Sequence, residues 1–156
     1  MQFTMKKQRG RCSTGWLQDV YPTIHTVQAA LERGDIYVGE YGGNIVGSMI
    51  LNHSQMDCYS EGKWNYNCPD NLIYVMPTLV IDPALSGRGF GRAFVNYYED
   101  SAKLNNCSEL RIDTQVKNVR ARAMYRKNGY KEIGIVPCVF NGIPDVQLVL
   151  LEKCLI

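Results

Sequence analysis

Apolar residues recur along the chain with two periods, one typical of helices and one typical of strands. Between residues 92 and 104, Phe94, Tyr98 and Ala102 are spaced as on one side of a helix. The charged residues of that segment take the other side. Gly34 and Gly129 follow helical stretches at positions where a left-handed residue often ends a helix.

The same pattern predicts six strands and three helical segments. The predicted strands are 35–40, 44–52, 72–81, 109–114, 131–136 and 146–153. The predicted helical segments are 15–33 (with a break at Tyr21-Pro22), 92–104 and 118–128. Residues 54–71 are polar, aromatic and rich in turn formers, which predicts a long excursion. Strands and helices in this order indicate an α/β protein with a sheet of mixed direction.

Composition narrows the class of protein. The chain has 156 residues, of which 46% are hydrophobic and 21% charged, with a net charge of +2. These values predict one folded domain over 1–156 and no nucleic-acid partner. Apolar runs fall far short of the roughly 20 residues that span a membrane, and the first residues do not resemble a signal peptide. We therefore expect a soluble, cytoplasmic protein without a membrane partner.

Six cysteines are scattered along the sequence without a CxxC or CxH pair. The two histidines, His25 and His53, are not at ligand spacing from any of them, so we expect no metal site. Because the chain is long enough to build a core and shows no secretion signal, we expect reduced thiols packed as small apolar groups.

A glycine-rich loop joins a predicted strand to a predicted helix. Gly87, Gly89 and Gly91 alternate with other residues, and Arg88 and Arg92 add positive charge. Backbone amides turned inward at the start of a helix form an anion nest, so a diphosphate is the expected ligand. The loop lacks the lysine and hydroxyl residue of a Walker A motif and the spacing of a dinucleotide-binding fingerprint.

Two motifs follow one another in this part of the sequence. The first is Leu79-Val80-Ile81-Asp82-Pro83, followed by the glycine loop. The second begins 27 residues after Gly91 and reads Asn118-x-x-Ala121-x-x-Met124-Tyr125-x-x-x-Gly129-Tyr130. In this order they resemble motif A and the next motif of the GNAT superfamily of N-acetyltransferases. The resemblance implies a GNAT-like α/β fold: a mixed, mostly antiparallel sheet, split in a V and flanked by helices. It also implies acetyl-CoA as co-substrate.

The resemblance further implies a role for each motif residue. Backbone groups of Leu79, Val80 and Ile81 would bind the pantetheine arm and the thioester carbonyl. Asn118 would bond the same arm, or act as a plain helix N-cap, or do both. Tyr125 would be the general acid near the CoA sulfur, a role that also suits the chemistry of a phenol beside a departing thiolate. The residues expected at the pyrophosphate are Gly87, Arg88, Gly89, Phe90, Gly91 and Arg92.

The general base is less clearly marked. Asp113 matches a position where some members of the family carry a catalytic glutamate, but it can also be a solvated residue or one paired with Arg111. His53, Glu61 and a water relay are alternatives. Residues that can line the acceptor site lie in or beside the excursion. They are His53, Gln55, Tyr59, Trp64 and Tyr66.

The chain departs from the family pattern twice. Ser86 stands where motif A usually has Arg or Gln. In addition, the segment near Met5-Lys6-Lys7 resembles the interior of the family's first helix, so the chain looks N-terminally short and we expect the first strand to be missing. An open sheet edge of that kind favours a homodimer.

These observations favour an acetyl-CoA-dependent N-acetyltransferase (an acyltransferase of EC 2.3.1 type). It would transfer an acetyl group directly to a primary amine on a small molecule or peptide. The alternative is a non-catalytic CoA- or acyl-CoA-binding module of the same fold. An unrelated phosphate-loop binder is disfavoured by the second motif.

Overall fold

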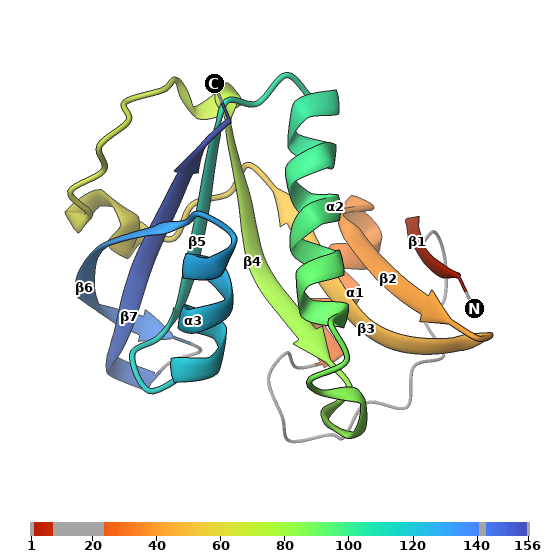
Figure 1. Cartoon of the computed structure of the whole chain (residues 1–156). Helices are drawn as coiled ribbons and strands as arrows, with labels where there is room; N and C mark the ends of the chain where they lie inside the picture. The colour runs from red at the N-terminus through yellow and green to blue at the C-terminus, as the bar shows by residue number, and fades with distance from the viewer. Residues whose placement is uncertain (1, 8–23, 141–142, 156) are drawn as a thin grey trace. The chain divides into compact units, whose positions relative to one another are not determined.

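The structure is a computed structural model that describes residues 2–7, 24–140 and 143–155 (Figure 1). The chain forms two compact units, Met1–Leu51 with Pro77–Phe94, and Asn52–Met76 with Val95–Ile156. Strand β4 (Ile73–Ile81) and helix α2 (Phe90–Leu104) each contribute residues to both units. The predicted helix over 15–23, including its break at Tyr21-Pro22, lies outside the described residues.

The first unit is built from a helix and antiparallel strands. Its remaining elements are β1 (Phe3–Lys7), α1 (Ile24–Arg33), β2 (Ile36–Tyr41), β3 (Asn44–Asn52) and the short 3-10 helix η3 (Pro83–Leu85). β2 pairs with β1 on one side and β3 on the other, and β4 follows β3 in the strand order. Val27 and Ala30 of α1 pack against Ile36 and Ile50. β2 and β3 correspond to the predicted strands 35–40 and 44–52.

The second unit carries the rest of the sheet and the excursion. Its elements are η1 (Asp57–Glu61), η2 (Asp70–Leu72), β5 (Glu109–Gln115), α3 (Val119–Lys127), β6 (Lys131–Phe140) and β7 (Ile143–Cys154). β7 lies between β5 and β6 and is antiparallel to both (Figure 1). Its core joins Tyr59, Val75, Leu148 and Leu150. The excursion predicted over 54–71 thus contains two 3-10 turns and packs into this core.

The strands follow the order β1-β2-β3-β4-β5-β7-β6. β4 and β5 are parallel, whereas the other pairs for which the register is described are antiparallel. The prediction of an α/β fold with a mixed, mostly antiparallel sheet flanked by helices is confirmed. β4 pairs with β5 over three residues, Ile73–Val75 with Glu109–Arg111. From Pro77 onward β4 belongs to the other unit, so the V-shaped split between these strands stays a prediction.

The expectation of a missing first strand is wrong. Residues Phe3–Lys7 form β1 and pair with β2 in antiparallel register. Half-buried Phe3 and Met5 alternate with exposed Thr4 and Lys6, which is the period of a strand. The ring of Phe3 packs against Phe90 and Phe94, and it lies where any side chain on Gly39 would collide with it. The short segment was misread as helical because five residues carry too little periodicity.

The expectation of reduced thiols is wrong for one pair of cysteines. Cys58 of η1 and Cys138 of β6 form a disulfide across 80 residues of sequence. Both residues are buried in the core of the second unit. Cys68, Cys107 and Cys154 are free thiols, and Cys12 lies outside the described residues. Sequence spacing could not reveal the pair because only the fold brings η1 to β6.

Two further findings bear on the expected partners. In the part of the chain that the structure describes, no helix is both long and apolar enough to cross a membrane. The same ranges contain no cluster of three His, Cys, Asp or Glu side chains suited to a metal ion.

Candidate active site

The glycine loop has the backbone conformation that its sequence predicts. Gly87 and Gly89 have φ of +83° and +86°, a region that side chains with a Cβ rarely adopt. An added Cβ would meet no atom within 4 Å at either position, so conformation and not crowding requires glycine there. Asp82 supports the approach to the loop by accepting a hydrogen bond from the Ala84 amide at 2.9 Å.

Helix α2 begins at Phe90, two residues before the predicted start. The Ala93 amide donates to the Gly89 carbonyl at 3.1 Å, which closes the first helical turn. Arg88 and Arg92 are exposed beside this start, as an anion site requires. The Phe90 side chain is buried against Phe3 and Tyr41. Its expected contact with a ligand would therefore come from its backbone, as for the other residues of the nest.

The end of β4, just before the loop, lies close to the backbone of β3. Leu79, Val80 and Ile81 end β4 and are half-buried. A side chain on Gly47 of β3 would come within 2.4 Å of the Val80 carbonyl oxygen, so glycine permits this approach of the two strands.

Helix α3 begins as the second motif predicts. The Asn118 side chain accepts a hydrogen bond from the Ala121 amide at 3.2 Å, which is an N-cap. Its carboxamide NH2 group can still donate elsewhere. Gly129 has φ of +86° just beyond the helix, as expected of a C-terminal glycine.

Tyr125 of α3 is buried, at 5% exposure. Burial and then the negative charge of Asp113 raise the pKa of Tyr125, so the phenol keeps its proton at neutral pH. The Tyr125 and Tyr130 rings meet edge to face at 5.9 Å. Tyr125 is therefore a protonated phenol whose pKa responds to the charge of Asp113.

Asp113 of β5 is held from the excursion and not by Arg111. The Tyr59 hydroxyl donates to Asp113 Oδ2 at 2.7 Å. Burial raises the pKa of Asp113 to about 6, and the Tyr59 hydrogen bond opposes that rise. The carboxyl is therefore ionised at neutral pH, and the expected alternative of an Arg111 pair does not occur.

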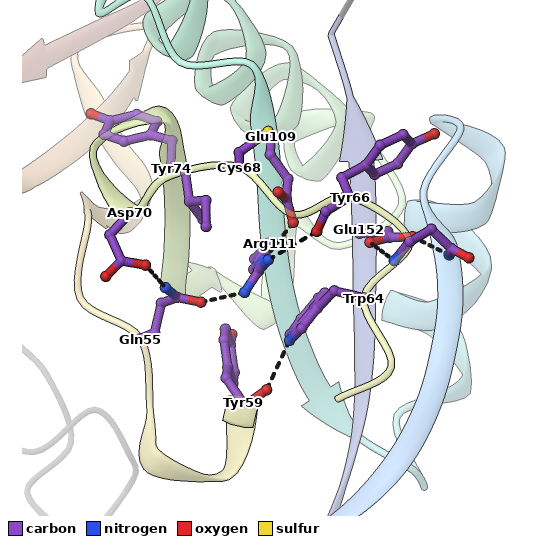
Figure 2. A network of polar contacts seen from close by, with 12 residues as sticks. Gln55, Tyr59, Trp64, Tyr66, Cys68, Asp70, Tyr74, Glu109, Arg111 and Glu152 are labelled. Carbon is purple, nitrogen blue, oxygen red and sulfur yellow. Dashed lines mark hydrogen bonds and ion pairs between the residues drawn. The ribbon is translucent and has the colours of Figure 1, made fainter. Parts of the chain in front are cut away.

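Arg111 instead anchors the excursion on β5 (Figure 2). Its Nε donates to Glu109 Oε1 at 2.6 Å, and one terminal nitrogen donates to Gln55 Oε1 at 2.6 Å. The guanidinium lies over the Trp64 ring at 4.0 Å. Trp64 Nε1 in turn donates to the Tyr59 carbonyl at 2.8 Å. One buried cation thus ties three excursion residues to the strand that carries Asp113.

A pocket of about 660 Å³ opens in this part of the second unit. Its walls include four of the five residues expected at the acceptor site. They are Gln55, Tyr59, Trp64 and Tyr66. His53 is not one of its lining residues, because its Nδ1 lies 2.7 Å from the Ile73 carbonyl oxygen and its ring packs on Tyr74.

Sequence reasoning missed the Glu109–Arg111 pair and the Tyr59–Asp113 bond. The alternation of residues 109, 111 and 113 along a strand could have placed all three on one face. Tyr59 lies 54 residues from Asp113 and left no comparable signal.

Comparison with known proteins decides the family. The family model described as Acetyltransferase (GNAT) family matches residues 4–130. The chain belongs to the GNAT family of acetyltransferases.

Sequence identity to individual curated proteins is low. The mycothiol acetyltransferase of Beutenbergia cavernae is 26% identical over 112 residues, which cover 71% of this chain and 38% of that protein. The chain thus spans little more than a third of the length of the curated relatives it matches.

Solved structures share the fold over nearly the whole chain. The IAA acetyltransferase of Bacillus cereus superposes with a TM-score of 0.72 at 19% identity, covering 99% of this chain and 100% of that one. A GNAT acetyltransferase of Elizabethkingia anophelis with acetyl-CoA bound gives a TM-score of 0.70 at 18% identity, with 98% of each chain covered.

Proposed function

We propose that this protein is an acetyl-CoA-dependent N-acetyltransferase that transfers the acetyl group directly to a primary amine on a small molecule or peptide. The observation that carries the proposal is the pair Asp113 and Tyr125. At neutral pH one carries a negative charge and the other keeps its proton. Base catalysis needs the first of these protonation states and acid catalysis needs the second.

Asp113 and Tyr125 each transfer protons in the proposed reaction. Asp113 accepts the proton that the acceptor ammonium must lose before its nitrogen attacks the thioester carbonyl. As the new C–N bond forms and the C–S bond breaks, Tyr125 donates its proton to the departing sulfur, and the second proton that the nitrogen loses restores the Tyr125 phenol. The amides at the end of β4 would stabilise the carbonyl oxygen of the transition state, an effect of about 3 kcal/mol.

Acetyl-CoA fits the residues of the loop. Backbone amides from Gly87 to Arg92, at the start of a helix with exposed Arg88 and Arg92, suit a pyrophosphate. Asn118 suits the pantetheine arm because its NH2 group remains a donor after capping α3.

The pocket under the excursion suits a cationic acceptor. Asp57 and Asp70 line it together with the aromatic Trp64. Lys63 and Arg111 also line it, but Arg111 is already paired with the buried Glu109. The remaining charges leave a negative excess, and carboxylates and aromatic rings both attract an ammonium group.

Ligand binding and turnover test the proposal in two steps. Acetyl-CoA and CoA should each raise the melting temperature of the protein, and ATP alone should not. Thiol release in the presence of a panel of primary amines should then show turnover. Stabilisation by CoA without thiol release would favour the non-catalytic CoA-binding module, and stabilisation by ATP alone would contradict both functions.

A cytoplasmic location and a homodimer stay predictions. The original reason for a dimer was an unpaired edge on β2, and β1 covers that edge. A dimer formed through this end of the sheet would therefore pair through β1, the first strand in the order. Size-exclusion chromatography with light scattering measures the oligomeric state.

A further inference from the structure

Tyr59 reaches Asp113 from a segment that lies far away in the sequence. It belongs to η1, its side chain is 3% exposed, and its hydroxyl donates to Asp113 Oδ2 at 2.7 Å. We propose that Tyr59 is a positioning residue for the acetyl transfer, holding one carboxylate oxygen of Asp113 so that the other can take the proton of the acceptor amine. This inference rests on the proposed role of Asp113 as the base.

The geometry leaves one oxygen of Asp113 for the substrate. Among the described residues, Tyr59 is the hydrogen-bond partner that the structure gives to the Asp113 carboxylate, and it occupies Oδ2. Asp113 is half-buried as a residue, and no described hydrogen bond occupies its Oδ1. In the proposed step one proton moves from the ammonium nitrogen to Oδ1, and Tyr59 keeps its own proton.

Contacts of Tyr59 and of the residue before it fix the position of Tyr59. Its carbonyl accepts from Trp64 Nε1 at 2.8 Å, and the two rings lie 5.3 Å apart. Arg111 stacks on Trp64 and is itself paired with Glu109, as Figure 2 shows. The preceding residue, Cys58, is bonded to β6 through the disulfide. A tyrosine held in this way can orient its neighbour without reorganising.

The charges around the pair agree with this role. Among the described residues, Tyr98 of α2 raises the pKa of Tyr59 and Arg111 of β5 lowers it, while Asp113 raises the pKa of Tyr125 of α3. Burial and then the charge of Asp113 raise the pKa of Tyr59, so it remains a donor. The hydrogen bond from Tyr59 lowers the pKa of Asp113, which would otherwise lie above its value of about 6.

The test removes the hydroxyl alone. In Tyr59→Phe, the pKa of Asp113 should rise, because the bond that favours the carboxylate is gone. Carbon-13 NMR of aspartate carboxyl groups, assigned with Asp113→Asn, measures this pKa without any substrate. The acid limb of kcat/KM should move to higher pH in parallel, with a several-fold loss at about pH 6 and little loss at about pH 9.

Tyr41→Phe is the control for loss of a tyrosine hydroxyl. Tyr41 is half-buried with its ring against Phe90, and no hydrogen bond of its hydroxyl is among those the structure describes. Its removal should change neither the Asp113 titration nor the pH profile. Replacement of Tyr59 by 3-fluorotyrosine covers the case in which Tyr59→Phe fails to fold. The more acidic phenol is a stronger donor and should lower the pKa of Asp113.

The outcomes separate the inference from the proposed function. An unchanged Asp113 titration in both Tyr59 variants overturns the positioning role. A moved titration with an unmoved acid limb, in an enzyme that still transfers acetyl groups, overturns Asp113 as the base and leaves acetyl transfer standing. If the wild-type protein binds CoA but acetylates no amine, the proposed function fails and the inference fails with it.

Discussion

The glycine loop and the excursion are organised in opposite ways. The loop, residues 87–92, would bind its ligand through backbone groups of one short stretch of sequence, and Gly87 and Gly89 have positive φ. The excursion acts through side chains, such as Gln55 and Tyr59, whose partners on β5 lie as many as 56 residues away. Substitutions in the two regions should therefore impair different properties. Loop variants should bind acetyl-CoA more weakly, whereas excursion variants should be less stable or show a changed pH dependence of activity.

The largest effect is expected at the anchor of the excursion. Arg111→Met leaves the fully buried Glu109 carboxylate without its ion-pair partner, which should lower the free energy of unfolding by about 3–5 kcal/mol. Denaturant unfolding measures the change. The double variant Glu109→Leu with Arg111→Met should recover much of the loss. If the double variant is no more stable than Arg111→Met, the buried charge is not the cause.

The next effect is on the proposed base. Asp113→Asn should lower kcat/KM by about 10²–10³ above about pH 7, because the amide cannot accept the ammonium proton. In the wild type kcat/KM should rise with pH through about 6, where Asp113 ionises, and this limb should vanish in the variant. Asp100→Asn, in an exposed pair with Lys103, is the control and should leave the profile intact. A wild-type limb that survives in Asp113→Asn would assign the base elsewhere.

A somewhat smaller loss is expected for the general acid. Tyr125→Phe should reduce kcat by about 10² at neutral pH, since the departing thiolate loses its proton donor. CoA affinity, measured by calorimetry, should change little. Normal turnover by this variant would show that the sulfur does not depend on Tyr125.

The smallest effect is expected in the loop. Gly87→Ala imposes a Cβ at φ of +83° and should destabilise the protein by about 1 kcal/mol, with weaker CoA binding. Gly134→Ala is a matched control, because its added Cβ also meets no atom within 4 Å and its φ is not positive. Equal CoA affinity in the two variants would mean that the loop does not use its left-handed conformation to bind the ligand.

The difference between the regions also explains what the sequence could predict. Strands β2 to β5, helix α3 and the glycine conformations follow from local patterns, and the structure confirms them. The candidate pair Asp113 and Tyr125 came from motifs, and in the structure the charge of Asp113 raises the pKa of Tyr125. The Tyr59 bond and the Cys58–Cys138 disulfide were not predictable, because each needs two distant segments to be folded first. β1 was misread because its alternation is only five residues long.

The disulfide makes the stability of the protein depend on how a preparation has been handled. Closing a loop of 80 residues stabilises a fold by about 4.5 kcal/mol on the chain-entropy estimate. Reductant in a storage buffer would open the bond and loosen η1, the element that carries Tyr59. Air-oxidised and reduced samples of the same chain should then melt at different temperatures. Thiol-release assays should be read against a blank without amine, because the protein contributes its own cysteines to the signal.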